Sequence, residues 1–154
     1  MGAVQGKWLN QLKAATHYNQ WIFSQFRPYL KGSVLEVGCG IGTFTELIAH
    51  SCPQVLAVDL NEDYTQQARD RLRHCTNLKI QTVDATQLQA NQTFDTIVML
   101  DVLEHIEDDI GVLQQLKQCL EPNGILILKV PAFNALYNSM DEAVGHYRRY
   151  TQDS

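Results

Sequence analysis

Three glycines spaced two residues apart constrain this chain more than any other feature. They are Gly38, Gly40 and Gly42, and they directly follow the short apolar run Val34–Val37. A pattern typical of a helix begins at once and covers residues 43–50. Glycine has no Cβ, so backbone rich in it can turn tightly and approach a ligand closely. We therefore predict a strand, a ligand-binding loop and a helix whose first turn offers unpaired N–H groups and a partial positive charge.

An acidic residue follows the next apolar run. The run Gln54–Val58 is typical of a second strand, and Asp59 stands at its end. We expect Asp59 beside the glycine loop, where a carboxylate can accept hydrogen bonds from ribose hydroxyls. The dinucleotide fingerprint G-x-G-x-x-G requires a third glycine, but Thr43 and Phe44 occupy the places after the loop. The sequence therefore lacks one residue that a nicotinamide-dependent oxidoreductase needs.

Length, charge and cysteine usage narrow the class of protein. The chain has 154 residues, enough for one domain with a buried core, and its net charge of −5 gives no basic surface for nucleic acid. Its four cysteines form no C-x-x-C pair, so neither a zinc site nor a disulfide framework is expected. The N-terminus lacks the apolar region of a signal peptide, and no apolar run approaches the roughly 20 residues that cross a bilayer. We expect a cytoplasmic protein without nucleic-acid partners or membrane insertion.

Strand and helix patterns alternate along the rest of the chain. They lie at 54–59, 62–74, 78–83, 94–100, 107–120 and 125–130. Asn61 is a candidate N-cap of the helix that follows it, and Glu121–Gly124 is typical of a turn. Such alternation predicts an α/β fold, a Rossmann-like doubly wound parallel sheet of five strands with helices on both faces.

Several segments together resemble the class I S-adenosylmethionine-dependent methyltransferases. Motif I corresponds to Glu36–Gly42, and the third strand ends in Val83-Asp84-Ala85. The fourth strand continues as Met99–Ile106, and Leu120–Leu126 is similar to the family's turn into the fifth strand. Each segment alone is common, but their order and spacing together are specific. The resemblance implies S-adenosyl-L-methionine as the cofactor and a strand order of 3-2-1-4-5.

The resemblance also implies a cofactor site, residue by residue. Asp59 would accept hydrogen bonds from the ribose hydroxyls, and Asp84 would bind the adenine amino group. Glu36 would order the glycine loop and reach the cofactor amine. A helix cap at Asp59 and a turn former at Asp84 are the simpler alternatives. The implied cofactor-binding residues are Glu36, Gly38, Cys39, Gly40, Gly42, Asp59, Leu60, Asp84, Ala85, Leu100, Asp101 and Val102.

Catalysis of methyl transfer depends mainly on positioning, because the sulfonium leaving group is already activated. A hydroxyl acceptor must also lose its proton, and His105 is the first candidate for the base, with His146 second. A structural role for His105, capping the following helix, is the alternative. Asp101, Glu104 and His105 also resemble a metal-binding pattern of the ubiquinone-pathway O-methyltransferases, which has Glu at the first position. We expect these residues to line the cofactor pocket and to hold no metal.

Residues 1–32 precede the first strand and show mostly helical spacing. In the family such leading helices often form a lid over the cofactor, and we expect the same here, with residues 33–154 as the cofactor-binding domain. The aromatic candidates for the lid are Trp8, Tyr18, Trp21 and Phe23. Packing of these rings on the sheet is the alternative.

The C-terminal part of the sequence leaves one sheet edge exposed. Strand 125–130 is apolar except for Lys129, and the antiparallel strand pair that the family usually adds beyond it is missing. We therefore expect a chain that is incomplete at its C-terminus, with an edge that self-associates or is covered by residues 132–150. The segment Gly145–Tyr150 resembles a bacterial subgroup of the family, and its two arginines are candidates for binding an anionic substrate group. A solvated helix face is the alternative for them.

These features favour a methyltransferase that acts on an oxygen atom of a small molecule or a lipid-linked sugar, with nitrogen and carbon acceptors left open. Two other functions remain as alternatives. One is the nicotinamide-dependent oxidoreductase, and the other is a cofactor-binding module without catalysis.

Overall fold

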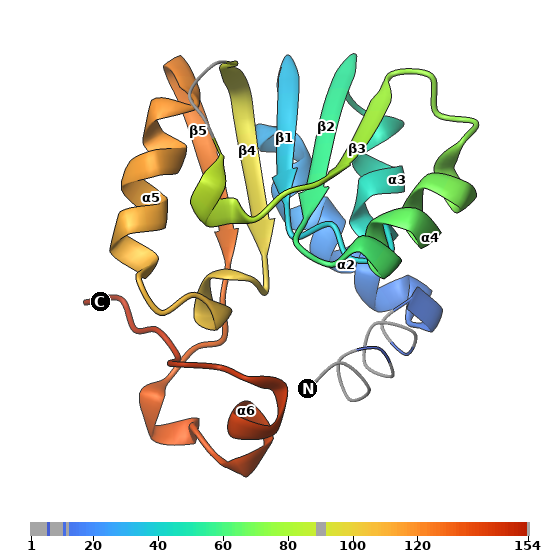
Figure 1. Cartoon of the computed structure of the whole chain (residues 1–154). Helices are drawn as coiled ribbons and strands as arrows, with labels where there is room; N and C mark the ends of the chain where they lie inside the picture. Colours follow the sequence, from blue (N-terminus) through green and yellow to red (C-terminus); the bar gives the residue numbers. More distant parts are fainter. Residues whose placement is uncertain (1–5, 7–10, 12, 89–91, 154) are drawn as a thin grey trace.

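The computed structural model describes residues 6, 11, 13–88 and 92–153, and it contains one parallel sheet of order β3-β2-β1-β4-β5 (Figure 1). The strands are β1 Ser33–Val37, β2 Gln54–Asp59, β3 Leu78–Thr82, β4 Phe94–Leu100 and β5 Leu120–Lys129. The described helices are α2 Thr16–Phe26, α3 Thr43–Ala49, α4 Glu62–Leu72, α5 Asp109–Gln118 and α6 Ser139–Val144. Short 3-10 turns are η1 Arg27–Tyr29, η2 Ala85–Gln87, η3 Leu103–His105 and η4 Asn134–Leu136. The predicted Rossmann-like fold and strand order are confirmed.

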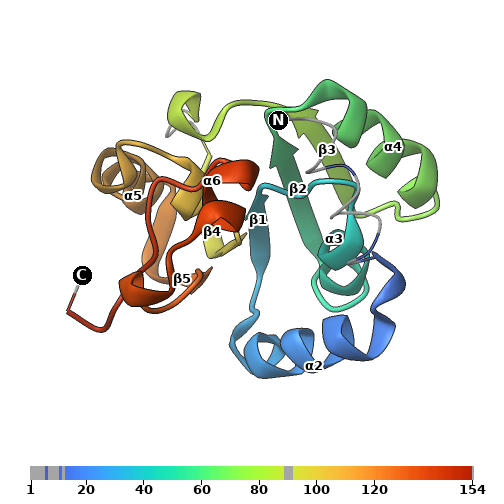
Figure 2. The same ribbon diagram turned by 90° about the horizontal axis from the view of Figure 1, so that it is seen from below.

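Alternate side chains of the central strands point to opposite faces of the sheet. Leu35 of β1 pairs in register with Ile97 of β4, and both are fully buried against α5 through Leu116. Val34 points the other way, into a second apolar cluster with Ile48 of α3. Figure 2 shows α5 on one side of the sheet and α2 and α3 on the other. Both faces are therefore dry, as the long apolar runs predicted.

Helix α2 belongs to the same core as the sheet. Phe26 at its C-terminal end is buried, and its ring contacts Phe23 and Phe44. Trp21 is instead 58% exposed, and Trp8 lies outside the described residues. The alternative of packing on the sheet therefore holds for Phe23 but not for Trp21. None of the helices in the described part of the chain combines the length and the apolar character needed to cross a bilayer.

Strand β5 begins earlier than predicted. It starts at Leu120, opposite Phe94, and the next pair joins Ile125 to Thr96, so the residues between bulge out of the ladder. Asn123 adopts a positive φ of 67° within this bulge. The predicted turn at 121–124 was wrong in placing these residues outside the strand, because a bulge accommodates the bend without ending the strand.

The segment after β5 does not run along the β5 edge. It lies beneath the carboxyl ends of the strands, with α6 at its centre (Figure 1). Ala132 forms a bridge with Tyr150, and the Tyr147 N–H donates to the carbonyl of Glu104 at 2.8 Å. The expectation that residues 132–150 cover the edge was therefore wrong, because their hydrogen bonds join them to the loop after β4.

The central position of Leu35 makes it a test of the core. Leu35→Ala should lower the free energy of unfolding by about 2–5 kcal/mol, because a buried leucine loses its contacts and leaves a cavity. Ile110→Ala on α5, where the side chain is 61% exposed, is the matched control and should change stability by less than about 0.5 kcal/mol. Urea denaturation measures both, and equal losses in the two variants would contradict this core.

Candidate functional site

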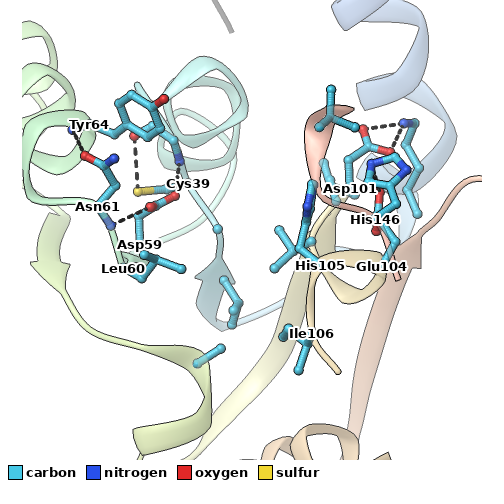
Figure 3. Close-up of a pocket in the computed structure, with 18 of the residues that line it drawn as sticks. Cys39, Asp59, Leu60, Asn61, Tyr64, Asp101, Glu104, His105, Ile106 and His146 are labelled. Atoms are coloured by element: carbon cyan, nitrogen blue, oxygen red, sulfur yellow. Dashed lines mark hydrogen bonds and ion pairs between the residues drawn. The ribbon is translucent and has the colours of Figure 1, made fainter. Parts of the chain in front are cut away.

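A cavity of about 550 Å³ opens at the carboxyl ends of the strands, where β1 separates β2 from β4. In a parallel sheet the connections leave β1 and β4 in opposite directions, and a crevice forms between them. Figure 3 shows one group of side chains from the β2–α4 side facing a second group from the loop after β4. The predicted site residues that line it are Glu36, Gly38, Cys39, Gly40, Asp59, Leu60, Asp84, Ala85, Leu100, Asp101, Val102, His105 and His146.

Two glycines of the loop have different reasons to lack a side chain. At Gly38, with φ of +79°, a Cβ would lie 2.1 Å from the Val102 side chain, so only glycine lets the two connections meet. At Gly42, with φ of +83°, a Cβ would lie 2.9 Å from Leu72 and 3.2 Å from Ala68. Gly42 does not line the cavity, so its place corrects the expectation of ligand contact: it lets α3 approach α4.

Asp59 joins the end of β2 to the glycine loop. Its carboxylate accepts from the Gly40 N–H at 2.8 Å and from the Asn61 N–H at 2.9 Å. Asn61 caps α4 through the Tyr64 N–H, as predicted, so the alternative of Asp59 as the cap is wrong. Burial raises the pKa of Asp59. Each of its oxygens keeps a lone pair that can accept a further hydrogen bond from a ligand.

Glu36 is a buried carboxyl at the end of β1. Its side chain is 4% exposed, and among the described residues its Oε2 has no hydrogen-bond partner. The Thr43 hydroxyl on the same cavity wall also lacks one within this described part. Burial raises the pKa of Glu36 to about 7. Unpaired buried polar atoms are costly, so this end of the cavity suits a ligand with cationic or hydrogen-bond donor groups.

Asp84 lies on the cavity wall but is occupied locally. Its Oδ1 accepts from the Thr86 N–H and from the Thr86 hydroxyl, each at 2.8 Å. These bonds cap η2, so Asp84 forms a turn as the alternative proposed. The second carboxylate oxygen leaves Asp84 able to bind a donor from a ligand.

The far side of the cavity holds Glu104, His105 and His146. The two imidazole rings meet edge to face with centroids 4.6 Å apart, and the His146 Nε2 lies 3.8 Å from the Glu104 Oε1. Glu104 is 1% exposed, and burial raises its pKa to about 7. Burial lowers the pKa of His105, so its ring is neutral near pH 7. His105 caps no helix, since Asp108 is the N-cap of α5.

The predicted metal pattern is not assembled as proposed. Asp101, at a positive φ of 52°, forms an ion pair with Lys129 at the end of β5. His146, rather than Asp101, lies beside Glu104 and His105. One possible ligand atom from each of Glu104, His105 and His146 lies within 4.8 Å of the other two. The carboxylates that a hard cation needs are thus reduced to one.

Sequence analysis missed Asp141 as a site residue, and it predicted a different role for Arg149; both residues line the cavity. Asp141 is 1% exposed and accepts two hydrogen bonds from the Arg149 guanidinium, at 2.8 and 2.9 Å. An acidic residue, a histidine and an arginine follow one another in the C-terminal segment, and this order could have indicated the contact between them. Arg149 is therefore already paired, which removes the expectation that it binds an anionic substrate group.

Aromatic rings from the N-terminal part close another side. Tyr18 of α2 and Phe44 of α3 line the cavity, as does Tyr64 of α4. Of the predicted lid residues in the described part of the chain, Tyr18 is the one that reaches it.

Comparison with known proteins gives one family. A family model described as a methyltransferase domain matches residues 35–126. Nodulation protein S of Sinorhizobium fredii is 30% identical over 98 residues, which cover 62% of this chain and 45% of that protein. The ubiquinone biosynthesis O-methyltransferase of Xanthomonas euvesicatoria is 31% identical over 110 residues, covering 67% and 46%. The chain spans about half the length of the curated relatives it matches.

Solved structures with this fold include the N-methyltransferase NodS from Bradyrhizobium japonicum in complex with S-adenosyl-L-homocysteine. It has a TM-score of 0.73 and 23% identity, and the match covers 90% of this chain and 69% of that one. At this identity the likeness establishes the fold alone.

The raised pKa of Glu36 predicts a pH-dependent stability. Between 4.5 and about 7 the native state keeps a proton that the unfolded chain releases, so Glu36 lowers the free energy of unfolding as pH rises through this window. Glu36→Gln should remove that loss, which urea denaturation near pH 5 and near pH 8 would measure. Glu62→Gln, on the exposed first turn of α4, is the control. Parallel pH profiles for wild type and Glu36→Gln would show that Glu36 titrates normally.

The cluster of Glu104, His105 and His146 contains one carboxylate, and the nearby Asp101 and Asp141 are paired with Lys129 and Arg149, so we predict that magnesium is not bound. Neither Mg²⁺ nor EDTA should change the melting temperature, because a hard cation takes six or more oxygen ligands. Thermal unfolding in each condition measures this. A melting temperature raised by Mg²⁺ or Zn²⁺, and no longer raised in Glu104→Gln, would make the cluster a metal centre.

Proposed function

The chain belongs to the methyltransferase domain family, and we propose that it binds S-adenosyl-L-methionine and transfers the methyl group to a small molecule. One observation carries this proposal: the buried Glu36 carboxyl, whose Oε2 has no partner among the described residues, the glycine loop and Asp59 face one cavity. A cofactor with an ammonium group and ribose hydroxyls supplies the donors that these acceptors need. The relatives named above support the proposal, since one is called an O-methyltransferase and another an N-methyltransferase.

The residues around the cavity fit this cofactor. Glu36 would bind its amine, Asp59 its ribose hydroxyls and the free oxygen of Asp84 its adenine amino group. Gly38 keeps the loop open to it, because any side chain there would collide with Val102. When bound, the cofactor supplies a methyl group on a positively charged sulfur. The protein's part is then to hold the acceptor in line with that group and to exclude water.

A hydroxyl oxygen is the acceptor that we propose. His105 and His146 stand across the cavity from Asp59, and the lowered pKa of His105 leaves a neutral ring that can accept a proton (Figure 3). An N-acceptor is the other candidate, because the related NodS structure is described as an N-methyltransferase.

Three further points belong to the same proposal. We place the protein in the cytoplasm, in agreement with four free cysteines. Residues 1–32 would act as a lid on the domain 33–154. The open edge of β5, where Leu128 is 40% exposed, would mediate self-association.

Asp59 provides the direct test. Asp59→Ala should weaken the binding of S-adenosylmethionine and S-adenosylhomocysteine by about 1.5–3 kcal/mol, the range for hydrogen bonds to a charged group. Asp63→Ala, at an exposed position of α4, is the matched control and should bind normally. Isothermal titration calorimetry measures all three proteins, with circular dichroism to confirm folding. Tight binding of NAD by the wild type, with no binding of S-adenosylmethionine, would refute the proposal.

A further inference from the structure

We propose that Asp141 is a positioning residue that holds His146 as a proton acceptor at the acceptor end of the cavity. The inference rests on the proposed function and narrows it. If two oriented histidines face the acceptor, the acceptor must carry a proton that it loses on methylation. The substrate class is then a hydroxyl compound or a primary or secondary amine, rather than a tertiary amine or a thioether.

Asp141 is held rigidly from several directions. It accepts from the Arg149 guanidinium at both oxygens, and its Oδ2 also accepts from the Asn138 N–H at 3.0 Å in the capping box of α6. These bonds, chiefly those of Arg149, lower the pKa of Asp141, so it is a carboxylate at any pH near neutral. An ionised carboxylate can only accept hydrogen bonds.

This carboxylate determines which nitrogen of His146 carries a hydrogen. Its Nδ1 lies 2.8 Å from the Asp141 Oδ1, so Nδ1 carries the hydrogen. In a neutral imidazole the other nitrogen is then a bare acceptor. That nitrogen, Nε2, lies 3.8 Å from the Glu104 Oε1, beyond hydrogen-bond distance. The Tyr137 hydroxyl donates to the His146 carbonyl at 2.7 Å and so fixes the backbone as well.

His105 is oriented in the same way by the same segment. Its Nδ1 lies 3.2 Å from the Gly145 carbonyl oxygen, and a carbonyl can only accept, so the hydrogen is again on Nδ1. The two rings are in edge contact, with planes 73° apart. Residues 141–146 therefore place a hydrogen on Nδ1 of both imidazoles, so in the neutral form of each ring Nε2 is the acceptor, and both rings line the cavity.

The charged groups around the His105 and His146 rings can accommodate a positive charge on one of the rings. Glu104 is buried with one oxygen unpaired among the described residues, and the charge of Asp101 is balanced by Lys129. Arg149 is likewise balanced by Asp141. Glu104 thus differs from the other charged groups around the two rings. In the described structure it forms no ion pair with a lysine or an arginine.

The step balances without a further reactant. A lone pair of the acceptor oxygen forms the new O–C bond as the S–C bond breaks, and the electrons of that bond remain on sulfur. The hydroxyl proton passes to Nε2 of His146. The products are a methyl ether, a neutral thioether and an imidazolium, so the positive charge moves from sulfur to the ring beside Glu104.

Nitrogen-15 NMR tests the inference directly, because long-range proton–nitrogen correlations report which imidazole nitrogen carries the hydrogen. In the S-adenosylhomocysteine-bound wild type, at a pH where the rings are neutral, His146 should be in the Nδ1–H form. In Asp141→Asn it should become mostly Nε2–H, since replacing such a carboxylate by an amide favours the wrong tautomer. His105, held by Gly145, is the internal control and should stay Nδ1–H in both proteins.

A second pair of variants keeps the test decisive if Asp141→Asn does not fold. Arg149→Gln should weaken the hydrogen bond from His146 Nδ1–H to Asp141 and so shift the Nδ1–H signal upfield, because Asp141 loses the guanidinium that holds it in place. Arg148→Gln should not, since Arg148 binds Asp109 and the Glu107 carbonyl instead. An Nε2–H tautomer of His146 in the wild type, or equal spectra in the two arginine variants, would overturn the inference.

Different measurements test the proposed function and this inference, so either can be refuted without the other. Calorimetry with S-adenosylhomocysteine decides whether the cofactor binds. The tautomer of His146 can also be measured in the unliganded protein. Normal binding with the wrong tautomer would leave the function standing and remove Asp141 from it. Absent binding with the expected tautomer would do the reverse.

Discussion

Parallel pairing of β1 with β2 on one side and β4 on the other is the constraint on which the site depends. It brings three carboxyl ends to one place, and the loops that leave them have to share that space. Gly38 has no side chain because Val102 of the next connection occupies the position where one would lie. Asp59 completes the arrangement, because its bond to the Gly40 N–H ties the loop of β1 to the end of β2.

The charges on the cavity wall are divided in a way that suits a cationic ligand. Carboxyl groups line it on both sides, at Glu36, Asp59, Asp84, Asp101, Glu104 and Asp141, and its cations Lys129 and Arg149 are each paired with one of them. Burial raises the pKa of both Glu36 and Glu104 to about 7, so these two carboxyl groups need not be ionised together with the others. A positive ligand would favour the ionised forms and so draw the carboxyl groups into their charged state.

Sequence reasoning succeeded where one local pattern determines the outcome. The glycine loop, Asp59 at a strand end and the Asn61 cap depend on neighbours within a few residues, and the alternation of strands and helices predicts a parallel α/β sheet. The strand order 3-2-1-4-5 was predicted from the resemblance to the methyltransferase family. Sequence reasoning failed where partners meet across long stretches of chain. Asp101, a member of the proposed metal-binding set, forms an ion pair with Lys129 instead, because β5 lies next to β4. Asp141 lies in the short helix α6, and its bonds to His146 and Arg149 join it to residues beyond that helix, where no periodicity predicts a contact.

The proposed acceptor side of the cavity is built differently from the proposed cofactor side. Among the described residues, those from 132 to 149 supply no member of either apolar core cluster, and hydrogen bonds and ion pairs hold them in place. Segments joined in this way open locally at a free energy below that of global unfolding. The sheet and its glycine loop can thus stay folded while residues 132–149 swing away. Under the proposed function a bulky product would leave by that route, and the rate of its departure would depend on the polar bonds of one short segment rather than on the core.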